Sequence, residues 1–326
     1  MNRHAVWLLL LLPLLLVGCS GISDTRPEIV RTSERMLERG VDAHNYGDYA
    51  TAIDLFSRAL GQYRSIDDRQ GMLYSHLNLA ETSLSGSHHE PAAQHIAAAT
   101  RLAKERDHLQ AQQRTTLLQA RWYWQQQQGE QALEQLSHIL PDFEGSRPLT
   151  RPNEVQLAAL ALRSEIALHQ EQEEQATRWI ARLRQSITRG RPDTPWHLLR
   201  LQRLEAQLAA EQGAYQQALA LLEEPLARYR EAAMRPAIAA TLREAAEIEQ
   251  RRGEPAQAIA LLERALHIRV WMMDRAHARQ LLRQLAQLHE QQGEETLAAE
   301  KRALADGITG ENNGQWRQLQ QSVKPR

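Results

Sequence analysis

The chain repeats itself at an interval of about 40 residues, and this repeat restricts the possible folds more than any other feature. Aligned on one turn residue, the 326 residues contain seven units with spacings of 40, 42, 42, 42, 40 and 40. The turn residues are Gly47, Ser87, Gly129, Glu171, Gly213, Gly253 and Gly293. A period of this length is typical of a solenoid, in which each unit packs only on its neighbours.

Small residues recur at fixed distances from each turn. Five residues after it stand Ala52, Ala92, Ala176, Ala218, Ala258 and Ala298. The third unit fits if two residues are missing after Gly129, so that Ala132, Leu136 and Ile139 take the places that elsewhere lie 5, 9 and 12 residues after the turn. These offsets share one helix face, where small side chains let a second helix approach. We therefore expect each unit to be a helical hairpin, with Trp122 filling a gap in the shortened third one.

Composition supports an all-α chain without nucleic-acid partners. Leu, Ala, Gln, Glu and Arg dominate, whereas the β-branched residues that sheets favour are scarce. The formal net charge is −1, with 39 basic and 40 acidic residues mixed along the chain, so the basic surface that phosphate binding needs is missing. A single cysteine excludes an internal disulfide.

The repeat resembles the tetratricopeptide repeat (TPR). The first unit carries the resemblance best, through Gly40, Gly47-Asp48-Tyr49, Ala52, Phe56 and Ala59. Its period exceeds the usual ~34 residues, so the helices or the turns must be longer. The resemblance implies a right-handed superhelical solenoid of about seven TPR-like hairpins over residues 30–306. A different α-solenoid is the alternative. We expect residues 307–326 to be a polar tail, with a short capping helix around Trp316 as the alternative.

The N-terminus is typical of an export signal. Basic and polar residues precede an apolar run over residues 5–17, which at 13 residues is shorter than the ~20 that span a bilayer. The run ends in Leu16-Val17-Gly18-Cys19, which resembles a bacterial lipobox. The resemblance implies removal of residues 1–18, a diacylglycerol and an N-acyl chain on Cys19, and a tether over residues 19–29. Ser20 in the next position implies the outer membrane, facing the periplasm. An ordinary cleaved signal is the alternative.

No arrangement of residues predicts catalysis, and we expect a non-enzymatic protein without metal or other cofactor. The chain lacks a Gly-x-Ser-x-Gly elbow and a Gly-rich phosphate loop. His89-Glu90 begins like a zinc-protease motif, but the next histidine, His95, is six residues on and follows Pro91. Two zinc ligands on one helix of this class need a separation of four residues. We expect His88, His89 and His95 to lie at a solvated turn.

A TPR-like array would present the first helix of each unit to a concave groove. Ten residues before each turn, the chain has Leu37, Leu77, Gln119, Ala161, Arg203, Arg243 and Arg283. Arg200 lies one helical turn before Arg203 and extends this arginine ladder. Forked guanidinium donors suit an acidic peptide or a carboxylate terminus. The alternative is a solvated face on which each ladder arginine pairs within its own helix, with Gln207, Glu247 or Gln287 four residues later.

The first half of the expected groove is less polar. Leu37, Leu77 and Tyr123 are the candidate contacts there, with Val41 and Tyr74 beside them. Such a stretch suits an amphipathic segment of a partner. Burial of these side chains in the core is the alternative.

Together these features predict an adaptor that holds a periplasmic or outer-membrane protein near the membrane during assembly of pilus, secretion or outer-membrane machinery. Two other functions remain open: a non-catalytic regulator of peptidoglycan synthases or hydrolases, and a binder of a small anionic ligand or glycan. Stacked units leave an apolar face at each end of the array unless it is capped, so homo-oligomers through the ends are also expected candidates.

Overall fold

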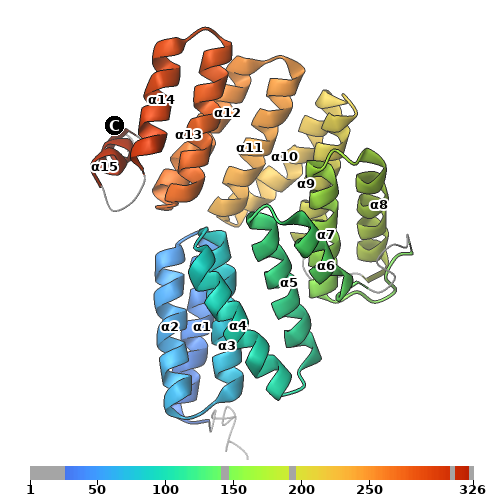
Figure 1. Cartoon of the computed structure of the whole chain (residues 1–326), viewed down its shortest axis with the longest axis vertical. Helices are drawn as coiled ribbons and strands as arrows, with labels where there is room; N and C mark the ends of the chain where they lie inside the picture. Colours follow the sequence, from blue (N-terminus) through green and yellow to red (C-terminus); the bar gives the residue numbers. More distant parts are fainter. Residues whose placement is uncertain (1–25, 141–146, 191–195, 309–312, 323–326) are drawn as a thin grey trace, which may run out of the picture.

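The computed structural model describes residues 26–140, 147–190, 196–308 and 313–322, and within these ranges the chain is all-helical with fifteen helices (Figure 1). The predicted signal, Cys19 and most of the tether lie outside the described residues. Consecutive helices form seven hairpins, followed by one last helix. The helices are α1 (Glu28–Tyr46), α2 (Tyr49–Ser65), α3 (Arg69–Ser85), α4 (His89–Glu105), α5 (Leu109–Gln125), α6 (Gly129–Ser137), α7 (Glu154–His169), α8 (Glu173–Gly190), α9 (Trp196–Glu211), α10 (Tyr215–Glu231), α11 (Arg235–Arg252), α12 (Pro255–Trp271), α13 (Arg275–Gln291), α14 (Glu295–Gly307) and α15 (Asn313–Ser322).

The turns that the structure describes in full between consecutive helices share one backbone form. Each contains a residue with φ between 49° and 85°, the left-handed region. The next N–H donates to the carbonyl five residues back, as from Asp48 to Ala43 at 2.8 Å and from Asp274 to Arg269 at 2.9 Å. This Schellman motif satisfies the last carbonyls of the helix. Glycine provides the left-handed residue at Gly47, Gly213, Gly253 and Gly293, and other residues adopt it elsewhere.

These turns explain the long period. The left-handed residues follow one another at intervals of 20 along two stretches, 47–127 and 213–293. Most helices in both stretches have 17 residues, so one helix and a short turn make a step of 20. A hairpin therefore takes 40 residues because its helices are long.

The third unit corrects our alignment. Its left-handed turn residue is Gln127, with φ 61°, whereas Gly129 is the first residue of α6. Measured from Gln127, Ala132 stands five residues after the turn without any deletion. The small residue that packs seven before the turn is Ala120, fully buried, and not Trp122. The corrected intervals are 40, 40, 44, 42, 40 and 40, so the irregularity lies in the middle of the chain.

Small residues hold each hairpin together as the repeat predicts. The alanine five residues after the turn is fully buried in all seven units: Ala52, Ala92, Ala132, Ala176, Ala218, Ala258 and Ala298. On the facing helix of the first unit, a Cβ at Gly40 would lie 2.4 Å from the Phe56 ring. Larger side chains at such positions would push the paired helices apart.

The hairpins build two layers of a superhelix. From α1 to α11, each odd-numbered helix contacts the next odd-numbered helix. No two even-numbered helices are in contact among the described residues. The inside of a curve is shorter than the outside, so the odd-numbered helices form the inner, concave layer. Figure 1 shows α1–α5 in its lower half and α10–α14 in its upper half, joined on the right through α6–α9.

The C-terminal segment differs from the polar tail that we expected. Helix α15 packs on α12 and α14, and Trp316 and Leu319 are 1% and 5% exposed. Both belong to the hydrophobic core of the last two hairpins, and Arg275 of α13 lies over the Trp316 ring at 5.4 Å. The chain therefore caps one end of the array with its own short helix around Trp316.

Candidate functional site

The arginines of the predicted ladder lie on the inner layer, where acidic partners face them. Arg203 of α9 makes a bidentate pair with Glu244 of α11, with Nε–Oε2 at 2.8 Å and Nη2–Oε1 at 2.5 Å. The side chains are 19% and 5% exposed. Burial lowers the pKa of Arg203, but the Glu244 carboxylate outweighs it and the pKa rises above its ordinary value. This pair fastens two neighbouring inner helices.

The other ladder arginines have different partners. Arg200 pairs with Glu165 of α7 at 3.3 Å, and Arg243 pairs with Glu247 one turn along its own helix. Arg283 reaches Asp306 of α14 at 3.4 Å, with both side chains more than half exposed. Of Arg203, Arg243 and Arg283, only Arg243 therefore makes the predicted pair with the residue four positions later in its own helix.

A second charged pair lies where α3 meets α5. Arg121 pairs with Glu81, whose side chain is 30% exposed. Burial would raise the pKa of Glu81, but the charges of Arg121 and Arg114 outweigh it and lower the pKa to about 2. Burial lowers the pKa of Arg200, with Glu165 opposing and the nearby Arg121 reinforcing the effect. The pairs thus form one electrostatically linked row.

Glu81, Glu165 and Glu244 are functional candidates that our sequence analysis missed, whereas it named Glu247 only as a pairing partner within one helix. With the third unit aligned on Gln127, the row residue six before the turn is Glu81, Arg121, Glu165, Gln207 and Glu247 in units two to six. Opposite charges thus alternate across α3, α5 and α7 at one repeat position. Alignment on Gly129 hid this signal, because it displaced Arg121 by two residues. We call these five residues with Arg200, Arg203, Arg243 and Glu244 the inner charge row.

The apolar half of the predicted groove is mostly core. Leu77 is 1% exposed and packs inside the core of the second hairpin, so it is not available to a ligand, which corrects that candidate. Leu37 is half-buried against the first hairpin's core. Tyr123 is half-buried against the core of α5–α9, with its ring edge-on to Trp122 at 5.2 Å. The Trp122 indole N–H donates to the carbonyl of His89 at 3.0 Å.

The superhelix closes on itself along a seam between the first hairpin and the later units. Nη1 of Arg235 donates to the carbonyl oxygen of Tyr46 at 3.2 Å, across 189 residues of sequence. Met272 packs against Gly47, where a Cβ would lie 2.5 Å from the methionine methyl carbon. Burial raises the pKa of Tyr49 to about 12, against the charge of Arg269 and its hydrogen bond. This seam joins α1 and α11 and brings the inner layer through a full turn.

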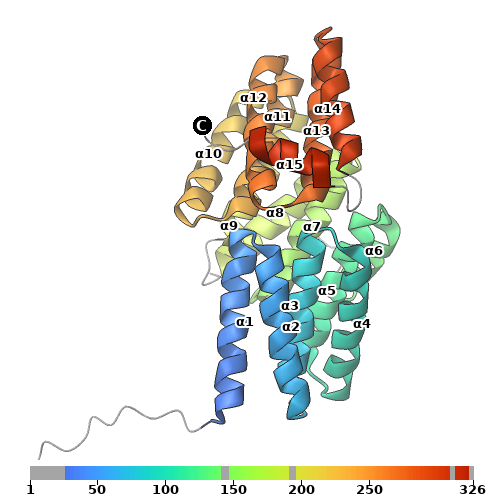
Figure 2. The same ribbon diagram turned by 90° about the vertical axis from the view of Figure 1, so that its left-hand side faces the viewer.

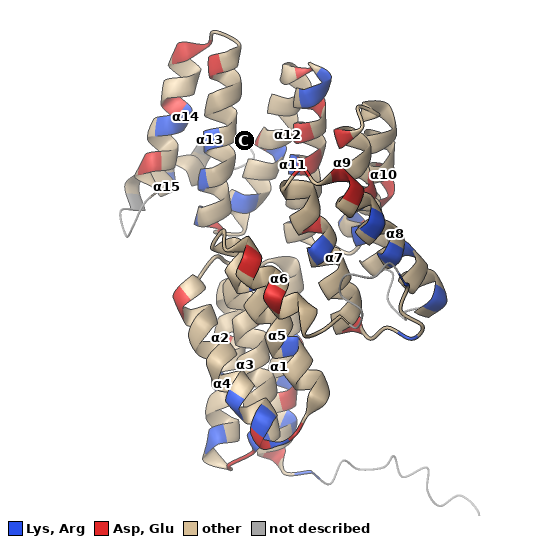
Figure 3. Ribbon diagram, turned by 45° about the vertical axis from the view of Figure 1, so that its right-hand side comes forward, with Lys and Arg blue, Asp and Glu red and all other residues tan. Residues whose placement is uncertain are grey.

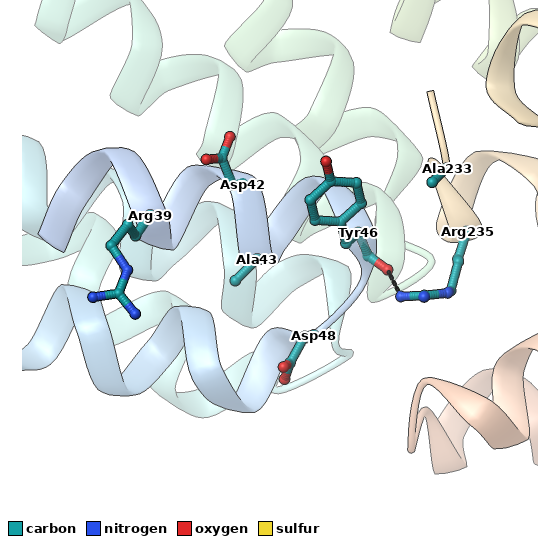
Figure 4. A pocket seen from close by; sticks show the side chains of 7 residues that line it. All are labelled: Arg39, Asp42, Ala43, Tyr46, Asp48, Ala233 and Arg235. Carbon is teal, nitrogen blue, oxygen red and sulfur yellow. Dashed lines mark hydrogen bonds between the residues drawn. The ribbon is translucent and has the colours of Figure 1, made fainter. Parts of the chain in front are cut away.

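Two cavities flank the seam. Figure 4 shows the first, of about 490 Å³, in which Arg235 donates to the carbonyl oxygen of Tyr46, and two further charged side chains, Arg39 and Asp42, line the part along α1 that is farther from Arg235. The second, of about 820 Å³, lies between the starts of α2 and α13, and Ile53, Met272 and Arg279 contribute to its wall. Neither contains residues of the inner charge row, so the seam is a separate feature.

The described residues were also compared with the requirements of a metal site and of a membrane-spanning helix. No group of three or more His, Cys, Asp or Glu side chains in the described ranges is arranged to hold a metal ion. His95 instead meets His76 of α3, with the two Nδ1 atoms 3.0 Å apart. None of the described helices combines the length and apolarity that crossing a membrane requires.

Comparisons with known proteins identify the fold. No protein-family model and no curated protein matches the chain. The Rap protein complexed with Competence and Sporulation Factor is similar over 88% of this chain and 78% of its own, with 13% identity and a TM-score of 0.58. NprR in complex with its cognate peptide NprX is similar over 89% and 81%, with 13% identity and a TM-score of 0.53. A tetratricopeptide repeat protein from Parabacteroides merdae aligns over 90% and 99%, with 14% identity and a TM-score of 0.47.

At these identities the likeness extends to the fold alone. This likeness agrees with the seven repeat units, the Schellman turns and the two layers of helices described above. The chain is an all-helical, TPR-like repeat protein.

Proposed function

We propose that this protein is a lipid-anchored adaptor of the outer membrane that holds an extended segment of a periplasmic partner protein against its inner charge row. The observation that carries the proposal is the row itself: partly exposed side chains of both signs stand on consecutive inner helices. Arg200 and Glu165 are 36% and 44% exposed, and Arg243 and Glu247 are 33% and 40% exposed.

The spacing of the row suits an extended chain. Neighbouring packed helices lie ~10 Å apart, which about three extended residues span. A segment with charges at that interval would exchange internal ion pairs for intermolecular ones and lose little electrostatic energy. Since each ladder arginine already has an acidic partner, a segment of mixed charge fits better than the purely acidic one that the arginines alone suggested. The complexes of Rap with Competence and Sporulation Factor and of NprR with its cognate peptide support this mode of binding.

The anchor is the second part of the proposal. Cys19 lies in the Leu16-Val17-Gly18-Cys19 sequence, and two or more acyl chains give stable attachment where one is marginal. Mass spectrometry of the N-terminal peptide is expected to find Cys19 diacylated and N-acylated. Cys19→Ser should make the protein leave the membrane fraction in a high-salt wash, which does not release an acylated protein. An unmodified Cys19 in cells would contradict the anchor.

Photo-crosslinking in cells tests the partner. A photoreactive side chain replaces Gln207 in the inner charge row, and the control places it at the exposed Gln217 on outer helix α10. We expect a discrete partner protein from Gln207 and not from Gln217. Envelope assembly components among the captured proteins would support the adaptor, whereas cell-wall synthases or hydrolases would make it a regulator of those enzymes. Identical capture from both positions would refute binding on the inner face.

A charge swap separates recognition from structure. Glu165→Arg combined with Arg200→Glu keeps the ion pair but reverses its direction. We expect the swapped protein to keep its thermal stability and to lose at least about tenfold in partner capture, since like charges then face the segment. Wild-type capture by the swapped protein would mean that the row is purely structural.

A further inference from the structure

Two exposed apolar side chains lie in neighbouring turns at the end of the molecule where the described chain begins. Figure 2 shows this end at the bottom, where α1 starts. Ile66, the residue that follows α2, is 42% exposed, and Leu109, the first residue of α5, is 68% exposed. Arg69 ties the two turns together, because it pairs with Asp67 at 3.4 Å and with Glu105 at 3.3 Å. Ile66 and Leu109 therefore lie on one face, which we call the anchor-end face.

Basic side chains surround this apolar pair, and charged residues gather at these helix ends in Figure 3. Those that are exposed and form no salt bridge within the described residues are Arg64, Arg101, Lys104 and Arg106. Most acidic groups nearby are already engaged: Arg69 holds two of them, and Asp68 accepts from the backbone N–H groups of Gln70 and Gly71. Asp107 and Glu28 are the exposed exceptions. On this face of the described chain, four basic side chains without a salt bridge therefore stand against two exposed acidic ones without a partner.

The buried histidine His76 lies close to two of these basic side chains. Burial is the main reason that its pKa falls to about 4, and the charges of His95, Arg64 and Arg101 add to the effect. The charges of Arg64 on α2 and Arg101 on α4 thus both act on this histidine of the second hairpin.

The start of the described chain lies at the same end of the molecule as the anchor-end face. Helix α1 begins at Glu28 beside the end of α2, where the Ser33 hydroxyl donates to the Gln62 side chain at 2.6 Å. Arg26 lies seven positions after Cys19, a reach of at most ~25 Å for an extended chain. If Cys19 is lipidated, as the proposed function holds, this end of the molecule must stay close to the bilayer.

We propose that the anchor-end face docks on anionic phospholipid headgroups, with Leu109 and Ile66 entering the interfacial zone and the basic side chains contacting phosphates. Interfacial binding of this kind combines buried apolar area with attraction of Lys and Arg to anionic lipid. Docking holds α1–α5 upright on the membrane and points α10–α14 into the periplasm, as in the orientation of Figure 2. The lipid on Cys19 supplies attachment, and the face supplies orientation.

Vesicle sedimentation tests this with the mature chain carrying Cys19→Ser, so that no acyl chain contributes. We expect binding to vesicles of phosphatidylethanolamine with phosphatidylglycerol that weakens with added salt, and little binding to phosphatidylcholine vesicles. Arg64→Glu with Arg101→Glu should lower the affinity at least about tenfold, because each basic residue near such a surface contributes roughly fivefold. The matched control is Arg230→Glu with Arg264→Glu, both exposed on outer helices away from the face.

The apolar pair has its own test. Leu109→Asp should lower vesicle binding, whereas Leu297→Asp, at a leucine 39% exposed on α14, should not. All four variants replace exposed residues, and circular dichroism verifies that they are folded. Equal binding by face and control variants, or binding regardless of lipid charge, would overturn the proposal. The charge swap in the inner row should leave vesicle binding unchanged, so loss of partner capture and loss of membrane docking are distinguishable.

Discussion

Arg203 and Arg283 occupy the same place in their repeats, yet they belong to very different regions. At α9–α11 the arginine is mostly buried and grips a carboxylate on the next inner helix, whereas at α13–α14 it is 60% exposed and reaches a surface aspartate. The cause lies one unit further along. Nine residues before the turn, the unit that follows Arg203 supplies Glu244, and the one that follows Arg243 supplies the neutral Gln284. Arg283 lies in the last hairpin of the described chain, so no following hairpin offers it a carboxylate at all. Arginines at one repeat position therefore differ in burial and in the partner that they bind.

Removal of the buried guanidinium gives the largest expected effect. Arg203→Ala leaves Glu244 buried without its partner, so we expect a loss of about 3–5 kcal/mol in the free energy of unfolding, measured by urea denaturation. Arg283→Ala, the matched exposed change, should cost less than about 0.5 kcal/mol. Adding Glu244→Ala to Arg203→Ala should recover part of the loss. Equal costs for the two arginines would erase the distinction between the regions.

Substitution of two turn glycines compares the stability of the seam with that of a turn without close neighbours. Gly47 and Gly253 both have left-handed φ, but only Gly47 has a neighbour within reach of an added Cβ, the side chain of Met272. Gly253→Ala should cost about 1–2 kcal/mol through backbone strain. Gly47→Ala should cost about 1 kcal/mol more, because Met272 must also move. Thermal denaturation of both variants measures the difference, and equal costs would mean that the seam does not contribute to stability.

Acid should remove the contribution that Glu81 of the inner charge row makes to stability. The pKa of Glu81 falls from 4.5 to about 2 in the folded state. A carboxylate with a lowered pKa stabilises the fold fully above pH 4.5, and this contribution is lost as the pH falls toward 2. Glu81→Gln should therefore lose less stability than wild type over this range in acid denaturation. Parallel curves would place Glu81 outside the set of groups that titrate on unfolding.

Arg243 offers a smaller, constructive test. Gln284→Glu with Glu247→Gln recreates around Arg243 the arrangement that Arg203 has with Glu244. We expect a coupling energy of about 1 kcal/mol between Arg243 and the new carboxylate in a double-mutant cycle, against less than about 0.5 kcal/mol for the present pair within one helix. No coupling would mean that burial, and not the residue at this position, separates the two regions.

Local features of the fold followed from the sequence, and long-range ones did not. The hairpins and the buried alanines could be predicted because they depend on residues within one unit. The third turn was misplaced because glycine signals a left-handed residue, yet Gln127 adopts that conformation and Gly129 begins a helix. The capping helix around Trp316 was only the alternative to a polar tail, because its contacts come from helices α12–α14, which sequence periodicity does not bring together.

The candidate site was predictable in part for the same reason. The sequence placed Arg203 and Arg243 on the inner layer, but their partners depend on which residues of successive units come opposite each other. Arg203 and Glu244 are 41 residues apart, one residue more than a repeat, so the pairing follows from small offsets between stacked helices. The seam depends on the sum of such offsets over five units, which no local pattern encodes.

The seam has a consequence for how this protein can change in length. Each step of 20 residues is locally self-sufficient, so duplication of one hairpin would disturb no turn and no packed alanine. It would, however, carry Arg235 and Met272 past Tyr46 and Gly47, because every added hairpin advances the superhelix by another increment of rotation and rise. The number of hairpins between α1 and α11 is thus fixed by a contact that none of those hairpins makes. The seam therefore fixes the number of repeats between α1 and α11. Hairpins added after α12, on the side where α15 packs, would leave the seam contacts in place.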